Sequence, residues 1–128
     1  MLRASVRAYD VCARYAGDEF LVIAESLGSP ADAPAVASRL VAELERPFLV
    51  DGRELRITAS AGVSVGPDYA VDAERLLRRA DLAMHAAKDA GGRGEFRLYD
   101  PAMGERIRDR LFVETCLREA IANGELRL

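Results

Sequence analysis

Apolar residues in the second half of the chain recur at helical spacing, which predicts an amphipathic helix over residues 72–90. Asp72 can cap the first turn of this helix, and Gly91 can end it. The expected apolar face consists of Ala73, Leu76, Leu77, Ala80, Ala83, Met84 and Ala87.

A last helix is expected to begin at Asp100-Pro101, because a capping residue followed by proline favours a helix start, and to end at Asn123-Gly124. A short strand, Phe96–Tyr99, is expected before it. The apolar positions of the helix are Ile107, Leu111, Phe112, Cys116, Leu117, Ala120 and Ile121. We expect them to form a stripe that another surface must cover.

The first half of the chain predicts short strands joined by tight turns. Val11–Tyr15 and Phe20–Ala24 are rich in β-branched and aromatic residues, and the Gly17-Asp18 turn between them indicates a hairpin. Residues 2–8 have one apolar side and no capping residue before them. We therefore expect the end of a helix there, in a chain that begins inside a domain.

A further helix and two strands are expected between the hairpin and residue 72. Asp32 can cap a helix that ends before Pro47. Phe48–Val50, the Asp51-Gly52 turn and Leu55–Val65 then favour two strands. The apolar residues of the helix are Ala33, Val36, Ala37, Leu40, Val41 and Leu44. Strands that alternate with helices predict an α+β or α/β sandwich, in which helices flank a sheet.

Composition fits a single soluble domain, because the 128 residues are 50% hydrophobic and 30% charged. A net charge of −3 and a pI near 5.2 argue against a nucleic-acid polymer as partner. No apolar run in the sequence is long enough to span a membrane, and we expect a cytoplasmic protein. Cys12 and Cys116 are expected to be reduced thiols in the core.

Asp18 and Glu19 place two adjacent carboxylates at the hairpin turn, which is the outline of a metal and phosphate site. Gly17 can supply the positive φ of the turn and lets a ligand approach the backbone. Because side chains alternate along strands, one carboxylate can hold a divalent cation while the other braces the turn or a second ligand. The alternative is a solvated acidic tip, and the turn alone does not decide between the two.

Four motifs, in order along the chain, resemble those of GGDEF domains, the bacterial diguanylate cyclase family. They are Arg14–Ile23, with Ala16 in place of the first glycine, Leu55–Ser64, Ala80–Lys88 and Tyr99–Met103. From Asp100 the chain also resembles the connector to a following EAL phosphodiesterase domain. The resemblance implies part of a GGDEF domain over residues 1–99 and a connector helix over residues 100–128. The implied fold is an incomplete nucleotide-cyclase-like α+β fold, with a ferredoxin-like antiparallel sheet flanked by helices.

The resemblance also implies a chemistry, because family members condense two GTP molecules to cyclic di-GMP with bound Mg²⁺ or Mn²⁺. It implies that Asp18 and Glu19 are catalytic and hold the metal, and that Gly17, Lys88 and Arg93 bind the substrate. Such phosphoryl transfer depends mostly on positioning and charge neutralisation. The alternative for Lys88 and Arg93 is a cationic helix end that complements the helix dipole.

Arg7-Ala8-Tyr9-Asp10 lies where many family members carry an Arg-x-x-Asp inhibitory site that binds cyclic di-GMP. Arg39, on the next predicted helix, falls where the family places a second arginine for that site. Two guanidiniums and a carboxylate suit the phosphates and guanine edges of a dinucleotide. The alternative is a set of surface ion pairs.

Family members carry another metal-binding aspartate and guanine-reading residues upstream of the hairpin, and this sequence contains none there. We therefore expect a chain that is inactive alone, from a parent that resembles a diguanylate cyclase and continues into an EAL domain. The alternative is a degenerate sensing domain that binds cyclic di-GMP or GTP and regulates that neighbour; an interaction scaffold is a third. Because the hairpin edge and the last helix lack a covering surface, we also expect a homodimer.

Overall fold

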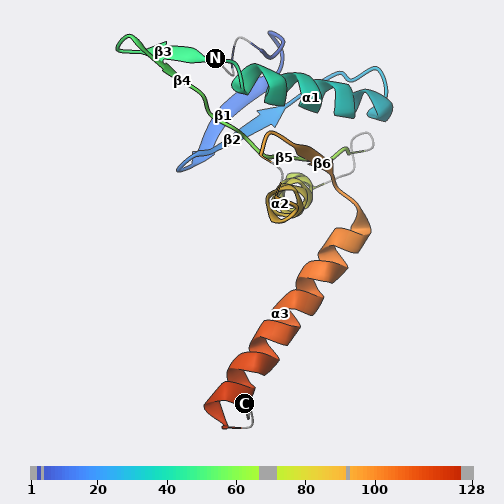
Figure 1. The fold of residues 1–128 in the computed structure, drawn as a ribbon. Helices are drawn as coiled ribbons and strands as arrows, with labels where there is room; N and C mark the ends of the chain where they lie inside the picture. The colour runs from blue at the N-terminus through green and yellow to red at the C-terminus, as the bar shows by residue number, and fades with distance from the viewer. Residues whose placement is uncertain (1–2, 4, 67–71, 92, 125–128) are drawn as a thin grey trace.

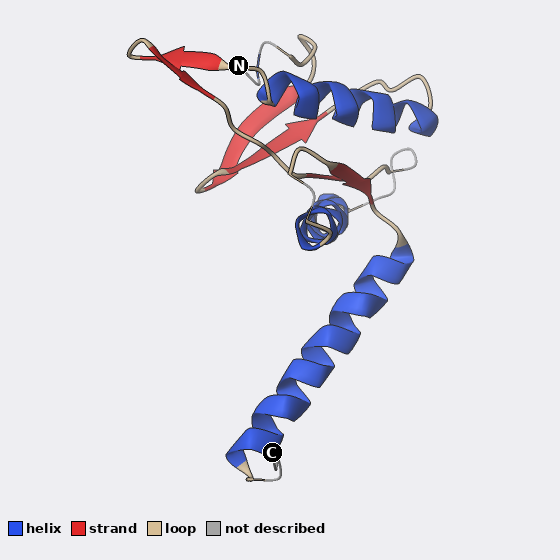
Figure 2. Cartoon of the chain, in the orientation of Figure 1, coloured by secondary structure: helices blue, strands red, loops and turns tan. Residues whose placement is uncertain are grey.

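The structure is a computed structural model of the 128-residue chain and describes residues 3, 5–66, 72–91 and 93–124. Helices and short strand pairs make up the described part (Figures 1 and 2). In chain order they are β1 (Val11–Ala16), β2 (Glu19–Ile23), the 3₁₀ turn η2 (Pro30–Asp32), α1 (Ala33–Leu44), β3 (Phe48–Val50), β4 (Arg53–Leu55), β5 (Ala61–Val63), α2 (Ala73–Asp89), β6 (Phe96–Leu98) and α3 (Pro101–Ala122). None of the described helices has both the length and the apolar run needed to cross a membrane.

The best-packed part of the molecule is a three-layer unit, in which the β5–β6 pair lies between α1 and α2 (Figure 1). β5 and β6 are parallel, with Ala61 opposite Phe96 and Val63 opposite Leu98. The buried residues come from the two helices and are small: Ala33, Ala37, Val41, Ala83 and Ala87. Small buried side chains let helix and strand backbones pack closely, so this unit is the core of the described chain.

Gly62 in β5 marks the closest approach of strand and helix. A Cβ atom at this position would overlap the carbonyl oxygen of Ala80 and the amide nitrogen of Met84 in α2. Nearby, the Ser64 hydroxyl donates a hydrogen bond of 2.7 Å to the carbonyl oxygen of Leu76. The contact between α2 and β5 is therefore made largely by backbone atoms and depends on glycine at position 62.

Capping residues set the helix starts, in one case differently from the sequence prediction. Asp72 and Asp100 each accept a hydrogen bond from the backbone amide two residues further on, as expected for α2 and α3. The expected cap of α1 by the Asp32 side chain is wrong, because that carboxylate accepts a hydrogen bond from the Ser29 amide at 2.9 Å. Ser29 and Asp32 form a reciprocal capping box around η2, which starts the chain turning before α1 begins.

Strand pairing differs from the expected single antiparallel sheet. Within the described residues the strands form three separate pairs, of which β1–β2 and β3–β4 are antiparallel and β5–β6 is parallel (Figure 2). The expected strand Leu55–Val65 is divided, because β4 ends at Leu55 and β5 begins at Ala61. Residues 56–60 have no neighbouring strand in the part of the chain that the structure describes. A strand needs a partner for its backbone groups, and the local sequence does not supply one.

The expected helix end over residues 2–8 is also wrong for the residues described there, which form no α-helix. Two hydrogen bonds between Arg7 and Asp10 close this segment into a turn instead. The Asp10 side chain offers the backbone a local partner that competes with a helical hydrogen bond.

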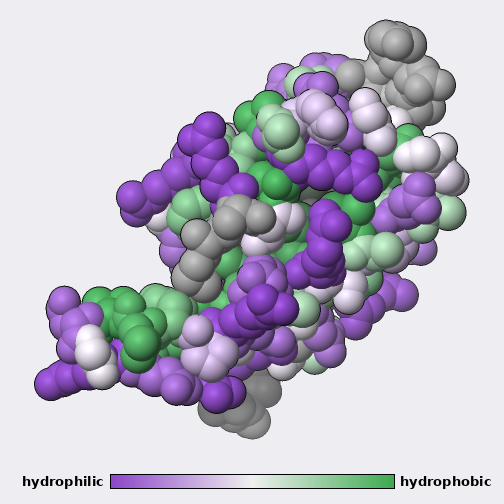
Figure 3. Space-filling model, turned by 90° about the horizontal axis from the view of Figure 1, so that it is seen from above, coloured by the Kyte–Doolittle hydropathy of each residue, from purple (hydrophilic) through white to green (hydrophobic). Residues whose placement is uncertain are grey.

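Two hairpins lie outside the three-layer unit. The β1–β2 hairpin lies below α1 in Figure 1 and makes no substantial packing contact with any other described helix or strand. The β3–β4 hairpin projects as an arm at the upper left of Figure 1, and apolar side chains gather on it at the lower left of Figure 3. Leu49 on the arm is 75% exposed, and Phe20 in the other hairpin is 59% exposed. Isolated two-stranded hairpins gain little stability by themselves.

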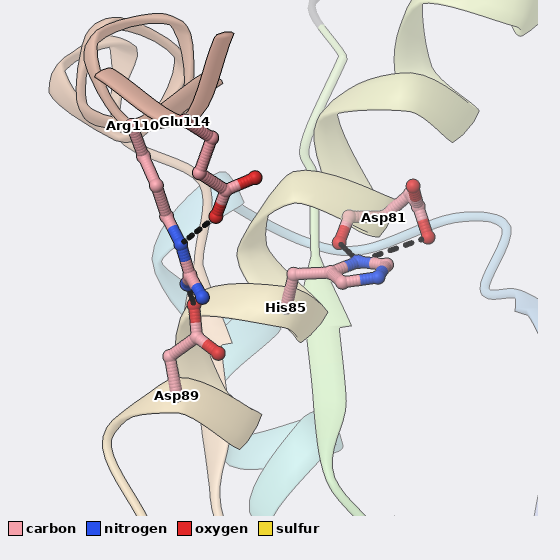
Figure 4. Close-up of polar contacts among 5 residues, drawn as sticks. All are labelled: Asp81, His85, Asp89, Arg110 and Glu114. Atoms are coloured by element: carbon pink, nitrogen blue, oxygen red, sulfur yellow. Dashed lines mark hydrogen bonds and ion pairs between the residues drawn. The ribbon is translucent and has the colours of Figure 1, made fainter. Parts of the chain in front are cut away.

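α3 extends away from the rest of the molecule after a contact with α2 near its start (Figure 1). Arg110 joins the two helices, because its Nη1 lies 3.1 Å from Oδ2 of Asp89 at the end of α2. The Nε of Arg110 also lies 3.2 Å from Oε1 of Glu114, as Figure 4 shows. All three side chains are exposed, so this is a surface cluster of charges.

The expected apolar stripe along α3 is wrong, because its apolar residues are distributed around the helix. A turn of about 100° per residue separates Leu111 from Phe112 and brings Phe112 over Cys116. Phe112 is 70% exposed and Ile121 is 67% exposed. The side chain of Ile107 lies outside the described part. The helix therefore has apolar surface but no single seam.

Both cysteines are free, as the sequence predicts. Cys12 is half-buried in β1, but Cys116 is exposed on α3, so the expectation of a core thiol is wrong for Cys116. The reason is that α3 makes its described contacts with α2, near the start of the helix, and nothing described covers its second half.

Candidate functional site

The candidate metal-binding residues lie at the tip of the β1–β2 hairpin. Ala16 pairs with Glu19, which leaves Gly17 and Asp18 as the two turn residues. Gly17 has the expected positive φ, of 50°, whereas Ala16 does not, so the methyl group of Ala16 adds no left-handed strain. The Nε of Arg14 donates a hydrogen bond of 2.8 Å to the carbonyl oxygen of Gly17 and holds the turn.

The two carboxylates at the tip have different surroundings. Asp18 is exposed and Glu19 is half-buried. Within the described ranges, no group of three or more His, Cys, Asp or Glu side chains could hold a metal ion. The tip therefore offers two carboxylates, and Mg²⁺ is often held in this way when a nucleotide's phosphates and water complete its shell. A Cβ atom on Gly17 would meet nothing within 4 Å, so a ligand has room to reach the turn.

The candidate phosphate-binding residues lie at and just after the C-terminal end of α2. Lys88 is exposed in the last turn of α2, and Arg93 is exposed in the loop that follows. Neither forms an ion pair with another described residue. The structure brings the two cations to one helix end, and α2 makes no substantial packing contact with the β1–β2 hairpin among the described residues.

The segment before β1 holds Arg7 and Asp10 in a tight turn. Oδ2 of Asp10 accepts a hydrogen bond of 2.8 Å from the Arg7 amide, and the Asp10 amide donates one of 3.0 Å to the Arg7 carbonyl oxygen. Oδ1 of Asp10 is buried and has no hydrogen-bond partner among the described residues. An unsatisfied buried acceptor is unfavourable by about 1–3 kcal/mol, so this oxygen would gain a partner only if the turn moved to expose it.

Arg7 and Arg39 line one pocket of about 370 Å³, although they are far apart in the sequence. α1 contributes Arg39 and, one turn later, Glu43. Ser5 and Val6 complete the lining. Ser5, Val6 and Glu43 were not predicted from the sequence, although the spacing of four between Arg39 and Glu43 could have indicated Glu43.

Comparison with known families and curated proteins gives consistent results. The family described as "Diguanylate cyclase, GGDEF domain" matches residues 1–94. Cyclic di-GMP phosphodiesterase PdeR of Escherichia coli is 39% identical over 116 residues, which are 91% of this chain and 17% of PdeR. The bifunctional diguanylate cyclase/cyclic di-GMP phosphodiesterase MucR of Pseudomonas aeruginosa is 35% identical over 127 residues, which are 99% of this chain and 18% of MucR. The chain thus spans less than a fifth of the length of these two relatives.

Solved structures give the same family. The GGDEF domain of TpbB (YfiN) from Pseudomonas aeruginosa, in a delta-N mutant, matches with a TM-score of 0.74 and 34% identity, over 84% of this chain and 62% of that one. An EAL/GGDEF domain protein from M. capsulatus matches with a TM-score of 0.69 and 31% identity, over 78% of this chain and 64% of that one. These matches confirm the expected nucleotide-cyclase-like α+β fold. Since sequence, relatives and structures agree, the chain belongs to the GGDEF domain family.

Proposed function

We propose that this chain is a GGDEF domain of a cyclic di-GMP signalling protein and that it binds cyclic di-GMP in the pocket between Arg7 and Arg39. The observation that carries the proposal is the meeting of two arginines from separate segments in one pocket. Neither forms an ion pair with a described residue, whereas Glu43 in the same lining lies 3.1 Å from Arg46. The two phosphates of a cyclic dinucleotide suit two unpaired guanidiniums.

Asp10 supports a guanine nucleotide in particular. One of its oxygens fixes the Arg7 backbone, and the other is buried without a partner. The edge of guanine presents two neighbouring N–H donors, which a carboxylate can accept. Asp10 does not line the pocket itself, so on this proposal the Arg7–Asp10 turn moves on binding and exposes Oδ1 to the guanine N–H groups.

Calorimetry with cyclic di-GMP on the whole chain tests this proposal. We expect cyclic di-GMP to bind more tightly than GTP, and Arg7→Ala and Arg39→Ala each to weaken its binding about tenfold or more, since each removes a charge-assisted contact. Arg53→Ala, on the β3–β4 arm, is the matched control and should leave binding unchanged. No heat with cyclic di-GMP, or heat that Arg7→Ala leaves the same, would remove the assignment.

The tip of the β1–β2 hairpin supports a second role, in metal and nucleotide binding by the parent protein. The family is one of nucleotide cyclases that generally depend on a metal ion, and Diguanylate cyclase TpbB of Pseudomonas aeruginosa is 36% identical over 103 residues. We infer that Asp18 and Glu19 hold Mg²⁺ or Mn²⁺ there, that Gly17 lets the nucleotide approach, and that Lys88 and Arg93 bind its phosphates. The bound ion would neutralise phosphate charge. The carboxylates position that ion, and the two cations orient the triphosphate.

The chain alone should make no cyclic di-GMP from GTP with Mg²⁺ or Mn²⁺. The support is that no described group of three or more His, Cys, Asp or Glu side chains could hold a metal ion, and that α2 makes no substantial described packing contact with the hairpin. Chromatography of the reaction mixture measures the product directly. Product above background that is lost on Asp18→Ala would contradict this expectation.

A regulatory role toward a phosphodiesterase neighbour is the alternative function. The relatives include PdeR and Cyclic di-GMP phosphodiesterase NbdA of Pseudomonas aeruginosa, which is 38% identical over 127 residues. On this proposal residues 1–99 are the GGDEF portion and residues 100–128 connect it to an EAL domain in a cytoplasmic part of the parent. Cyclic di-GMP hydrolysis by the full-length parent should then change with Arg7→Ala, and an unchanged rate would exclude regulation through this pocket.

A further inference from the structure

The outer edge of β6 has backbone groups with no described partner. Glu95 and Tyr99 both bond to β5, because the Glu95 carbonyl accepts from the Ala61 amide at 2.9 Å and the Tyr99 amide donates to the Val63 carbonyl at 2.7 Å. Successive residues of a strand direct their backbone groups to opposite edges. The N–H and C=O groups of Phe96 and Leu98 therefore face the other edge, where no described strand pairs with β6.

A pocket of about 650 Å³ lies beside β6. It is lined by residues 95–101 and Met103, a nearly continuous run of chain that includes all of β6. The hollow therefore lies between β6 and the first turn of α3. An open edge beside such a hollow can accept an additional strand.

We propose that β6 pairs with β6 of a second copy of this chain, antiparallel and about a twofold axis at Phe96. In this register Phe96 exchanges two hydrogen bonds with its counterpart through backbone groups that are otherwise unpaired. The two β5–β6 pairs then form one four-stranded sheet. The interface is isologous, so a single patch serves both copies.

Charge complementarity selects this register and the second copy as the occupant. Glu95 and Arg97 flank Phe96 and are both exposed. With Phe96 opposite Phe96, each Glu95 lies opposite the Arg97 of the other copy, which gives two ion pairs of opposite charge. A shift that centres the axis on Arg97 would put the two arginines opposite each other and is disfavoured. The half-buried Phe96 rings meet across the axis as an aromatic pair.

This interface uses none of the residues assigned to the proposed nucleotide sites. Glu95 and Arg97 are in neither the Arg7–Arg39 pocket nor the hairpin tip. It also differs from the sequence expectation of a dimer through the β1–β2 hairpin or α3. Because the shared ladder is short, we expect a dissociation constant in the micromolar range. This affinity is weaker than is usual for interfaces of standard size.

Light scattering and sedimentation of the whole chain over a range of concentration test the proposal. The natural chain should form dimers, and Glu95→Arg or Arg97→Glu alone should weaken dimerisation about tenfold or more, because each places like charges opposite each other. The double variant Glu95→Arg/Arg97→Glu should dimerise again. Mixing the two single variants should give a heterodimer, since each then meets the opposite charge.

Arg53→Glu on the arm is the matched control for charge and should leave dimerisation unchanged, and circular dichroism checks that every variant folds. A chain that stays monomeric at all concentrations would overturn the proposal. A dimer that neither single variant weakens would place the interface on another element and would overturn it equally. Failure of the double variant and of the mixed singles to associate would exclude the Phe96-centred register.

Discussion

The three-layer unit and the β1–β2 hairpin differ in how they are held, although both carry candidate functional residues. α1 and α2 enclose β5–β6 and supply the buried residues, whereas the hairpin makes no substantial packing contact with another described element. The unit contributes Arg39 and Lys88, and the hairpin contributes Asp18. The three-layer unit therefore supplies most of the stability. Some of the candidate functional residues lie instead on the hairpin, which contributes little to that stability.

The largest expected loss of stability is at Gly62. If this loss were not observed, the layered unit would not be the more stable of the two regions. Gly62→Val adds a side chain that would overlap the backbone of Ala80 and Met84, so α2 must move away from β5. We expect a loss of about 3 kcal/mol in the free energy of unfolding, measured by urea denaturation. Gly17→Val at the open hairpin turn is the contrast, with strain of about 1–2 kcal/mol from its positive φ alone. Equal losses at both positions would show that the helix–strand contact is not close.

Two side-chain truncations, one in each region, should change the free energy of unfolding by intermediate amounts. Val41→Ala removes buried apolar volume from α1 and should lower the free energy of unfolding by about 2 kcal/mol. Phe20→Ala removes a larger side chain that is 59% exposed on the hairpin, and should cost below about 1 kcal/mol. Thermal or urea unfolding measures both. A greater loss at Phe20 would mean that the hairpin is packed against a surface in solution.

A smaller effect is expected where α3 meets α2. Arg110→Ala removes two exposed ion pairs, with Asp89 and Glu114 (Figure 4), and exposed pairs contribute about 0–1 kcal/mol each. The loss should shrink further as salt is added, because exposed charges are screened. Denaturation at low and high salt checks this, with Arg108→Ala on the same helix as control. A loss well above this range would make α3 part of the core.

The smallest effect on stability is expected at the hairpin tip itself. Asp18 is exposed and takes part in no described ion pair, so Asp18→Asn should change the free energy of unfolding by less than about 0.5 kcal/mol. The same substitution should abolish any Mn²⁺ binding at the tip, measured by calorimetry with the metal alone. Retained binding would remove Asp18 as the metal ligand.

Local signals in the sequence predicted α1, α2 and α3 well, but not the structure of residues 2–8. Helical spacing with Asp72 and Gly91 at the ends predicted α2, and Asp100-Pro101 predicted the start of α3. These signals succeed because caps and helical periodicity act over a few residues. The Asp32 cap failed because Ser29, three residues earlier, competes for the same carboxylate.

Long-range features could not be predicted in the same way. The parallel pairing of Ala61 with Phe96 joins segments separated by all of α2, and nothing local in β5 specifies that partner. The division of Leu55–Val65 has the same cause, since its first part lacks a strand to pair with among the described residues. For the site, the turn at Gly17 was predictable, but the meeting of Arg7 with Glu43 of α1 required the fold.

The placement of Arg7 and Arg39 has a consequence for the entropy of binding. Arg39 belongs to α1 in the layered unit, and Arg7 belongs to the segment that enters the weakly packed hairpin. A ligand that contacts both guanidiniums must restrict the motion of one region relative to the other, and this ordering offsets part of the contact energy. Affinity at the pocket therefore reports how rigidly residues 5–10 are already held. Any contact that stiffens this segment, even a remote one, would act as a positive effector without touching the ligand.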